Sequence, residues 1–115
     1  MPENEYDLVF SNIIDSDFDQ SYNYIKETLE APKAAEKLFD ELDIKIAEIL
    51  KNPYKRPLVQ DKYLASLGIR SIKIKNYILF YNITEEANRV NAIRFMYKKR
   101  DWKKILKEKS LEDII

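Results

Sequence analysis

The sequence contains no cysteine and no histidine, which removes most of the side chains that hold metals or act as catalytic nucleophiles and bases. Without cysteine no disulfide can form, and the usual zinc, copper and iron ligand sets are absent, so we expect no metal and no cofactor. A Ser-His-Asp or Cys-His catalytic site is excluded for the same reason.

Glycine occurs only once, at Gly68, which excludes phosphate-binding loops of the GxGxxG or GxxxxGK[ST] type. Long hydrophobic runs are also missing, since no apolar stretch approaches the roughly 18 residues that a membrane-spanning helix needs. The N-terminus carries Glu3, Glu5 and Asp7, whereas a secretory signal begins with positive charge. We therefore expect a cytoplasmic protein with no membrane contact.

What the sequence does contain is a strong division of charge. The 115 residues carry no net charge, yet residues 1–50 hold 13 acidic and 4 basic side chains, whereas residues 51–115 hold 16 basic and 7 acidic ones. Such an asymmetry indicates an anionic partner for the basic half. The alternative is that acidic helices pair with a basic sheet of the same molecule. At this length we expect one domain, residues 1–115.

The first half of the chain predicts a strand and two helices. Residues 6–11 form a short apolar run rich in β-forming residues, which predicts the strand. Apolar residues at helical spacing then predict a first helix: Phe18, Tyr22, Ile25 and Leu29. Pro32 fits the first turn of a second helix, and Asn52-Pro53 ends it. Because only about three residues separate the two helices, they should form a hairpin with an acidic outer face.

The second half predicts a connection, three strands and a short helix. Residues 51–68 form a connection that is long for a compact domain, so they carry function or fold against the core. Three β-rich runs follow at 69–75, 77–84 and 89–97, which predicts an antiparallel meander. Residues 100–109 predict a final helix. The fold class is therefore α+β, with one sheet, helices on one face and the other face partly open.

Side chains alternate along a strand, so parity predicts which of them face the helices. The first strand of the meander divides into two groups, Ile72 with Ile74 and Ser71 with Lys73 and Lys75. We expect the isoleucines to face the helices and the lysines to point away. The middle strand is apolar on both faces, although Tyr77 and Tyr81 should lie together on one side.

An arginine interrupts the apolar run of the last strand. Parity places Arg94 with Ala92 and Met96, on the face opposite to Ile93 and Phe95. The open face would then carry cations and phenols and continue into a basic segment: Lys73, Lys75, Tyr77, Tyr81, Arg94, Lys98, Lys99, Arg100, Lys103, Lys104 and Lys107. Such a surface suits a polyanion or an acidic peptide.

Several of these residues also have a structural explanation. Lys73 and Lys75 can protect a strand edge from aggregation. Arg94 either makes a salt bridge to the acidic helices or serves in binding, because a charge inside an apolar strand is costly unless it is paired or solvated. Trp102 is expected to anchor the final helix, with base stacking as the alternative.

An ordered set of motifs resembles the RelE/ParE toxins of bacterial type II toxin–antitoxin systems. The motifs are GIRSI from Gly68, NYILFY from Asn76, and the last segment with Val90, Ile93-Arg94, Tyr97 and Arg100-Asp101. The similarity extends to the helical hairpin and to the DKYLASLG connection, and so covers about residues 6–107. It implies the RelE/ParE fold, in agreement with the class predicted from the pattern of elements.

The resemblance also implies a partner and an activity. Such a toxin belongs to a plasmid-stabilisation or addiction module and is neutralised by a cognate antitoxin, whose tail wraps the helices and sheet in a toxin–antitoxin hetero-oligomer. Operator DNA would be bound only through the antitoxin. ParE-like members poison DNA gyrase by binding, whereas RelE-like members cleave mRNA on the ribosome.

The residues favour a ParE-like toxin. RNA cleavage through the 2′-hydroxyl needs a base, cations at the phosphate and an acid, and no histidine is present for either proton transfer. Many RelE-like nucleases carry arginine directly after the tyrosine of the middle strand, where this chain has Ile78. Many ParE-like members have histidine where Tyr97 stands; this departure leaves the fold resemblance intact and leaves any acid–base role at Tyr97 open.

The predicted contact residues for gyrase or antitoxin are Arg70, Lys73, Lys75, Tyr77, Arg94, Tyr97, Lys98, Arg100 and Trp102. One alternative is a ribosome-dependent endoribonuclease, in which Lys73, Lys75 and Arg94 hold the phosphate and Tyr97 carries the proton. Another is an inactive family member that retains only antitoxin binding. A surface role for Arg94 predicts that Arg94→Ala weakens toxicity without loss of stability, and a structural role predicts the reverse.

Overall fold

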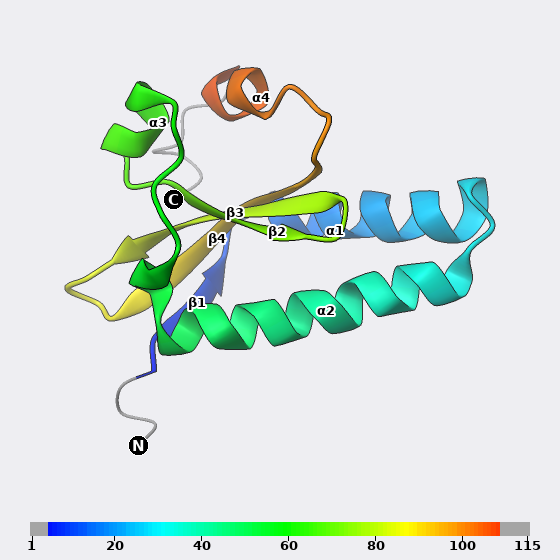
Figure 1. The fold of residues 1–115 in the computed structure, drawn as a ribbon, viewed down its shortest axis with the longest axis horizontal. Coiled ribbons are helices and arrows are strands. Elements are labelled where there is room, and N and C mark those ends of the chain that lie inside the picture. Colours follow the sequence, from blue (N-terminus) through cyan, green and yellow to red (C-terminus); the bar gives the residue numbers. More distant parts are fainter. Residues whose placement is uncertain (1–4, 109–115) are drawn as a thin grey trace.

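The computed structural model describes residues 5–108 and contains one four-stranded sheet with helices on both sides (Figure 1). The elements in chain order are β1 (Asp7–Phe10), α1 (Ile14–Asn23), η2 (Tyr24–Thr28), α2 (Pro32–Lys51), η3 (Pro53–Lys55), α3 (Lys62–Ser66), β2 (Arg70–Ile74), β3 (Tyr77–Thr84), β4 (Arg89–Tyr97) and α4 (Trp102–Glu108). The predicted α+β class is confirmed. The predicted end of the last helix at Lys109 lies outside the described residues. None of the helices within residues 5–108 is long and apolar enough to cross a membrane.

The strands lie in the order β1-β4-β3-β2, so the first and last strands of the chain are neighbours. β1 pairs in parallel with β4, whereas β2, β3 and β4 form the predicted antiparallel meander. A parallel pair requires a long crossover, and here the connection between β1 and β4 contains the whole hairpin and two strands. The turn between β2 and β3 is tight, and Lys75 in this turn adopts a left-handed φ of 54°.

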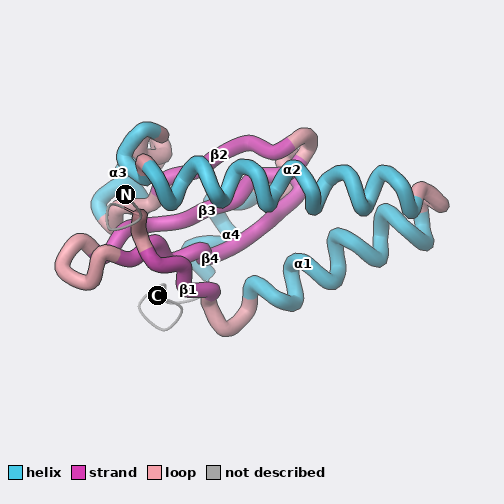
Figure 2. The backbone as a smooth tube through the Cα atoms, turned by 90° about the horizontal axis from the view of Figure 1, so that it is seen from below, coloured by secondary structure: helices cyan, strands magenta, loops and turns pink. Residues whose placement is uncertain are grey.

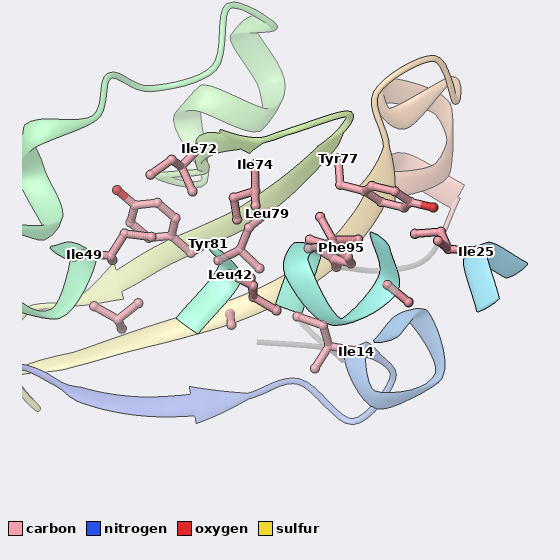
Figure 3. Packing of buried hydrophobic residues seen from close by; sticks show 14 residues of the cluster. Ile14, Ile25, Leu42, Ile49, Ile72, Ile74, Tyr77, Leu79, Tyr81 and Phe95 are labelled. Carbon is pink, nitrogen blue, oxygen red and sulfur yellow. The ribbon is translucent and has the colours of Figure 1, made fainter. Parts of the chain in front are cut away.

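The hairpin of α1 and α2 covers one face of the sheet and buries the larger core, as Figure 2 shows. α2 contributes Leu38, Leu42 and Ile49 at helical spacing, each at most 3% exposed. The sheet contributes Ile72, Ile74, Tyr77, Leu79, Tyr81, Val90, Ala92 and Phe95 (Figure 3). The expected direction of the isoleucines and the pairing of the two tyrosines are thus confirmed. Both phenol rings, however, face the helices and not a cationic surface.

The opposite face carries a second core under α3, α4 and the connection before β2. Leu64 of α3 and Leu106 of α4 are at most 1% exposed and pack over Phe80 and Ile93. The ring of Trp102 lies 5.1 Å from that of Phe80, so this residue anchors the final helix as expected. The second face is therefore less open than the sequence predicts, and the long connection folds against the core.

A bulge in β4 changes which side chains face each core. Arg94 and Ala92 pair with consecutive residues of β3, so Ile93 is an extra residue in β4. Ala92 and Phe95 consequently share the core under the hairpin, while Ile93 and Met96 belong to the core under α4. The predicted grouping of Ile93 with Phe95, and of Ala92 with Met96, is wrong because a bulge interrupts the alternation of a strand.

Arg94 is not a free surface cation, because Asp17 of α1 binds it. The guanidinium donates from Nε to Asp17 Oδ2 at 2.7 Å and from Nη2 to Oδ1 at 2.8 Å. The same carboxylate accepts the backbone N–H of Phe95 at 2.9 Å. The Arg94 and Asp17 side chains are only 15% and 8% exposed, so the pair is largely buried and bidentate. The salt-bridge alternative is confirmed, and the expectation that Arg94 is an exposed cation is wrong, although its pairing with Phe80 keeps it on the sheet face of Lys73.

This ion pair lies where β1 ends and the edge of β4 loses its strand partner. Ser11, directly after β1, donates its backbone N–H to the Ala92 carbonyl at 2.9 Å and its hydroxyl to the Ile93 carbonyl at 2.7 Å. Asp17 then accepts the next N–H on this edge, that of Phe95. Side chains thus continue the pairing of polar backbone groups that β1 begins.

Replacing Arg94 with alanine should destabilise the fold strongly. The change leaves the Asp17 carboxylate buried without its counter-charge, which typically costs about 3–5 kcal/mol. Urea unfolding followed by Trp102 fluorescence should show a correspondingly lower midpoint. Lys37→Ala, at an exposed position of α2, is the control and should change stability by less than about 0.5 kcal/mol. An unchanged midpoint for Arg94→Ala would show that the pair is not structural.

Tyr81 should make stability sensitive to alkaline pH. It is fully buried, its hydroxyl donates to the Pro53 carbonyl at 2.8 Å, and burial raises its pKa to about 12. Between pH ~10 and ~12 the unfolded chain loses this proton while the folded chain keeps it, so the free energy of unfolding falls as pH rises. Tyr81→Phe should flatten this decline, and near neutral pH it should cost about 1 kcal/mol because the Pro53 carbonyl loses its donor. Urea midpoints of both proteins across this range provide the test, and equal slopes would contradict it.

Candidate functional site

A groove of about 740 Å³ opens between the tip of the helical hairpin and one end of the sheet. α1, η2 and the first turns of α2 form one side, and the β2–β3 turn and the end of β4 form the other. The hairpin extends beyond the sheet at this end, as Figure 1 and Figure 2 show. The polar and charged side chains of the lining are Asp17, Gln20, Ser21, Tyr24, Lys75, Asn76, Tyr77, Tyr97 and Arg100. A concave surface with apolar walls and a few polar groups is typical of a binding site.

Stacked aromatic rings form the sheet side of the groove. The Tyr77 ring lies parallel to that of Phe95, with centroids 5.0 Å apart and an interplanar angle of 9°. Tyr97, 39% exposed, meets Tyr77 edge-on at 5.6 Å. Burial raises the pKa of the Tyr77 phenol, so this hydroxyl stays neutral near pH 7. In Figure 3 the Tyr77 hydroxyl points toward Ile25 of the hairpin.

A π-helical turn forms much of the helical side. α1 continues into η2, in which Tyr24 is 50% exposed and Ile25 is buried. Leu29 follows η2 and is 54% exposed, although the helical spacing of the sequence places it in the core. Turns of this type are rare and occur frequently at functional sites. Tyr24 and Leu29 give the groove an apolar lip, which is the kind of surface that a partner covers.

Two cations lie at the groove, Lys75 and Arg100. The Lys98 backbone N–H donates to the Asn76 carbonyl at 2.8 Å, which holds the segment after β4 against the β2–β3 turn. Lys75, Tyr97 and Arg100 are thereby brought to the same groove. Within residues 5–108, neither cation has a carboxylate oxygen within 4.0 Å. The arrangement can therefore bind a carboxylate or a phosphate beside an apolar surface.

The predicted contact residues do not form one surface. Those that line the groove are Lys75, Tyr77, Tyr97 and Arg100, and those outside it are Arg70, Lys73, Arg94, Lys98 and Trp102. Arg70 lies at the other end of β2, where its guanidinium is 5.2 Å from the Tyr54 ring and donates to the Arg56 carbonyl. Lys73 is exposed on the α4 side of the sheet, because it alternates with the buried isoleucines. The single cationic face expected from parity is therefore wrong.

The sequence interpretation also missed the hairpin side of the groove. Gln20, Tyr24 and Leu29 line it, and none of them was a predicted contact residue. Tyr24 falls outside the apolar stripe of the first helix, which is a signal that it reaches solvent. No feature of the sequence indicates that the helix widens into a π-helical turn at this position.

Comparison with known proteins agrees with this fold. The sequence model described as the ParE toxin of the type II toxin–antitoxin system parDE matches residues 8–102. No curated protein sequence matches the chain.

Solved structures with this fold include the toxin–antitoxin complex RelBE2 from Mycobacterium tuberculosis, at 19% identity and a TM-score of 0.56, covering 81% of this chain and 98% of that one. The chromosomal ParDE system of P. aeruginosa has 13% identity and a TM-score of 0.63, covering 82% and 97%. A mutant of the E. coli toxin RelE in the free state has 16% identity and a TM-score of 0.61, covering 96% and 99%.

At such low identities these three structures establish the fold alone. The family match has a different weight, because it spans most of the chain, from β1 to the start of α4. The chain therefore belongs to the ParE toxin family of type II toxin–antitoxin systems.

Proposed function

We propose that this toxin acts by binding DNA gyrase and not by cleaving RNA. The observation that carries the proposal is the burial of Arg94 against Asp17. In the nuclease alternative Arg94 would hold the phosphate, but its charge is already neutralised by a bidentate carboxylate. A gyrase poison needs only a binding surface, and the groove with its apolar lip supplies one.

Proton transfer is the second difficulty for a nuclease. The sequence contains no histidine, and burial raises the pKa of the Tyr77 phenol, which makes it a poorer base at neutral pH. Tyr97 is then the one tyrosine at the sheet end of the groove that is exposed. A single phenol without a histidine or carboxylate partner is a weak basis for both proton transfers.

The same groove is the surface on which we expect the cognate antitoxin. Two of the similar structures are a RelBE2 toxin–antitoxin complex and a ParDE system. Tyr24 and Leu29 offer apolar contacts, and Lys75 and Arg100 offer pairing with carboxylates, so an acidic amphipathic segment would be complementary. Gyrase is a cytoplasmic enzyme, so the proposal places toxin and antitoxin in that compartment.

A ribosome-dependent endoribonuclease is the second candidate, and one observation favours it. Lys75, Tyr97 and Arg100 line the same groove, so two cations and a phenol could meet one phosphate. This set differs from the one that the sequence suggested, because Arg94 is absent from it and Arg100 is added.

Purified full-length toxin should inhibit DNA supercoiling by purified gyrase at micromolar concentration and should increase the amount of cleaved DNA in the reaction. The reason is that a poison binds the enzyme while the DNA is open and slows resealing. The measurement is gel analysis of plasmid topoisomers with and without the toxin. Addition of the co-expressed antitoxin should restore supercoiling.

The alternatives give different results in the same series of assays. Unchanged supercoiling together with codon-dependent cuts in an mRNA on programmed ribosomes would establish the nuclease and contradict the proposal. Normal growth of bacteria that express the chain alone at a high level would indicate an inactive family member.

Leu29→Ala should weaken binding of the groove's partner by about tenfold, because it removes exposed apolar surface that the partner would bury at the lip of the groove. Ile44→Ala is a matched control, since Ile44 on α2 is also 54% exposed but does not line the groove. Both changes should leave the urea midpoint nearly unchanged. Equal effects of the two variants on gyrase inhibition would remove the groove from the proposal.

A further inference from the structure

The charge division of the sequence becomes a division between layers in the fold. The acidic first half forms β1 and the hairpin, whereas the segment around α4 lies on the other side of the sheet (Figure 1). Residues 98–107 contain one acid and six cations, Lys98, Lys99, Arg100, Lys103, Lys104 and Lys107. The sheet therefore separates the acidic helices from α4, whereas Arg100 lines the groove beside the hairpin.

Ion pairs inside the molecule neutralise little of the basic segment. Among the described residues, the pairs between the two halves of the chain are Asp17 with Arg94 and Glu48 with Arg56, the latter at 3.7 Å. Lys107 pairs at 2.7 Å with Asp61, which holds α4 beside α3. Among the described residues, no ion pair thus joins the acidic helices to α4.

The exposed lysines lie on a rigid support. Trp102 and Leu106 pack the inner side of α4 into the second core, and Lys103 and Lys104 are exposed. The ammonium group of Lys103 lies 5.7 Å from the centroid of the Trp102 ring. Lys99 is exposed in the segment that leads into the helix. Within residues 5–108, no carboxylate oxygen lies within 4.0 Å of any of these three ammonium groups. Three exposed cations are therefore available on α4 and on the segment that leads into it.

We propose that this side of α4 binds the phosphate backbone of duplex DNA, so that the toxin holds the DNA segment bound by gyrase as well as the enzyme. The inference rests on the proposed gyrase-binding function and names a second partner for it. Lysine contacts to phosphate carry no sequence information, so the binding should be independent of sequence. An acidic peptide is a poorer fit, because Lys103 and Lys104 leave the outer side of the helix without a large apolar anchor.

The test uses the purified full-length toxin and a fluorescein-labelled duplex of mixed sequence, followed by fluorescence anisotropy without gyrase. If three lysines neutralise three phosphates, affinity should fall about 40-fold between ~50 and ~200 mM salt. Lys103→Gln combined with Lys104→Gln should reduce this dependence to about fourfold and weaken binding at low salt. Lys33→Gln combined with Lys37→Gln, two exposed positions of α2, removes the same charge and should leave DNA binding unchanged.

Three results would overturn the inference. They are no anisotropy change at low salt, equal loss of affinity in the two double variants, and tighter binding to single-stranded RNA or polyglutamate of similar length than to the duplex. A measurement of gyrase binding without DNA distinguishes failure of this inference from failure of the proposed function. Loss of the DNA contact with gyrase binding intact refutes the inference alone, whereas DNA binding without any gyrase binding refutes the proposed function.

Discussion

The carboxylate of Asp17 makes the interaction on which the arrangement of this fold depends. It binds the Arg94 guanidinium through both oxygens and also accepts the Phe95 backbone N–H, so one side chain of α1 holds both a side chain and the backbone of β4. β1 is only four residues long and leaves the continuation of the β4 edge without a strand. Because helix α1 occupies that edge, the hairpin is fixed against the sheet by polar contacts as well as by the apolar core.

The position of the groove follows from this attachment. α1 is held at β4 near its first turns, and its later turns run past the end of the sheet together with the start of α2 (Figure 2). The concavity lies beneath this overhang, with Tyr77 and Phe95 stacked at its sheet side. Asp17 itself lines the groove, so the contact that supports the fold is also part of the candidate site. A substitution there would change stability and binding together, which is why Leu29 separates the two effects better.

Local patterns predicted much of the fold because they depend on neighbouring residues alone. The two helices of the hairpin and the alternation around Ile72 survive in the structure, since each reflects a regular element. The bulge at Ile93 and the turn at Tyr24 were not predictable, because packing between distant segments determines both. Only the sheet side of the candidate site was predicted, and there only in part, because side-chain parity fails beyond a bulge. The hairpin side was not predicted, because a helical stripe gives no indication of a π-helical turn.

The charges of this chain sum to zero, but its individual surfaces are charged. The sheet and its two cores separate the acidic hairpin from the lysines of α4, so opposite charges face solvent on opposite sides. In water at physiological salt, interactions beyond about 8 Å are strongly screened, and each side presents its own charge to a partner. A partner that covers the groove would leave the outer side of α4 accessible. An antitoxin that binds the groove would therefore have to neutralise the toxin by blocking its contact with gyrase, because the antitoxin would not occupy the surface proposed for DNA.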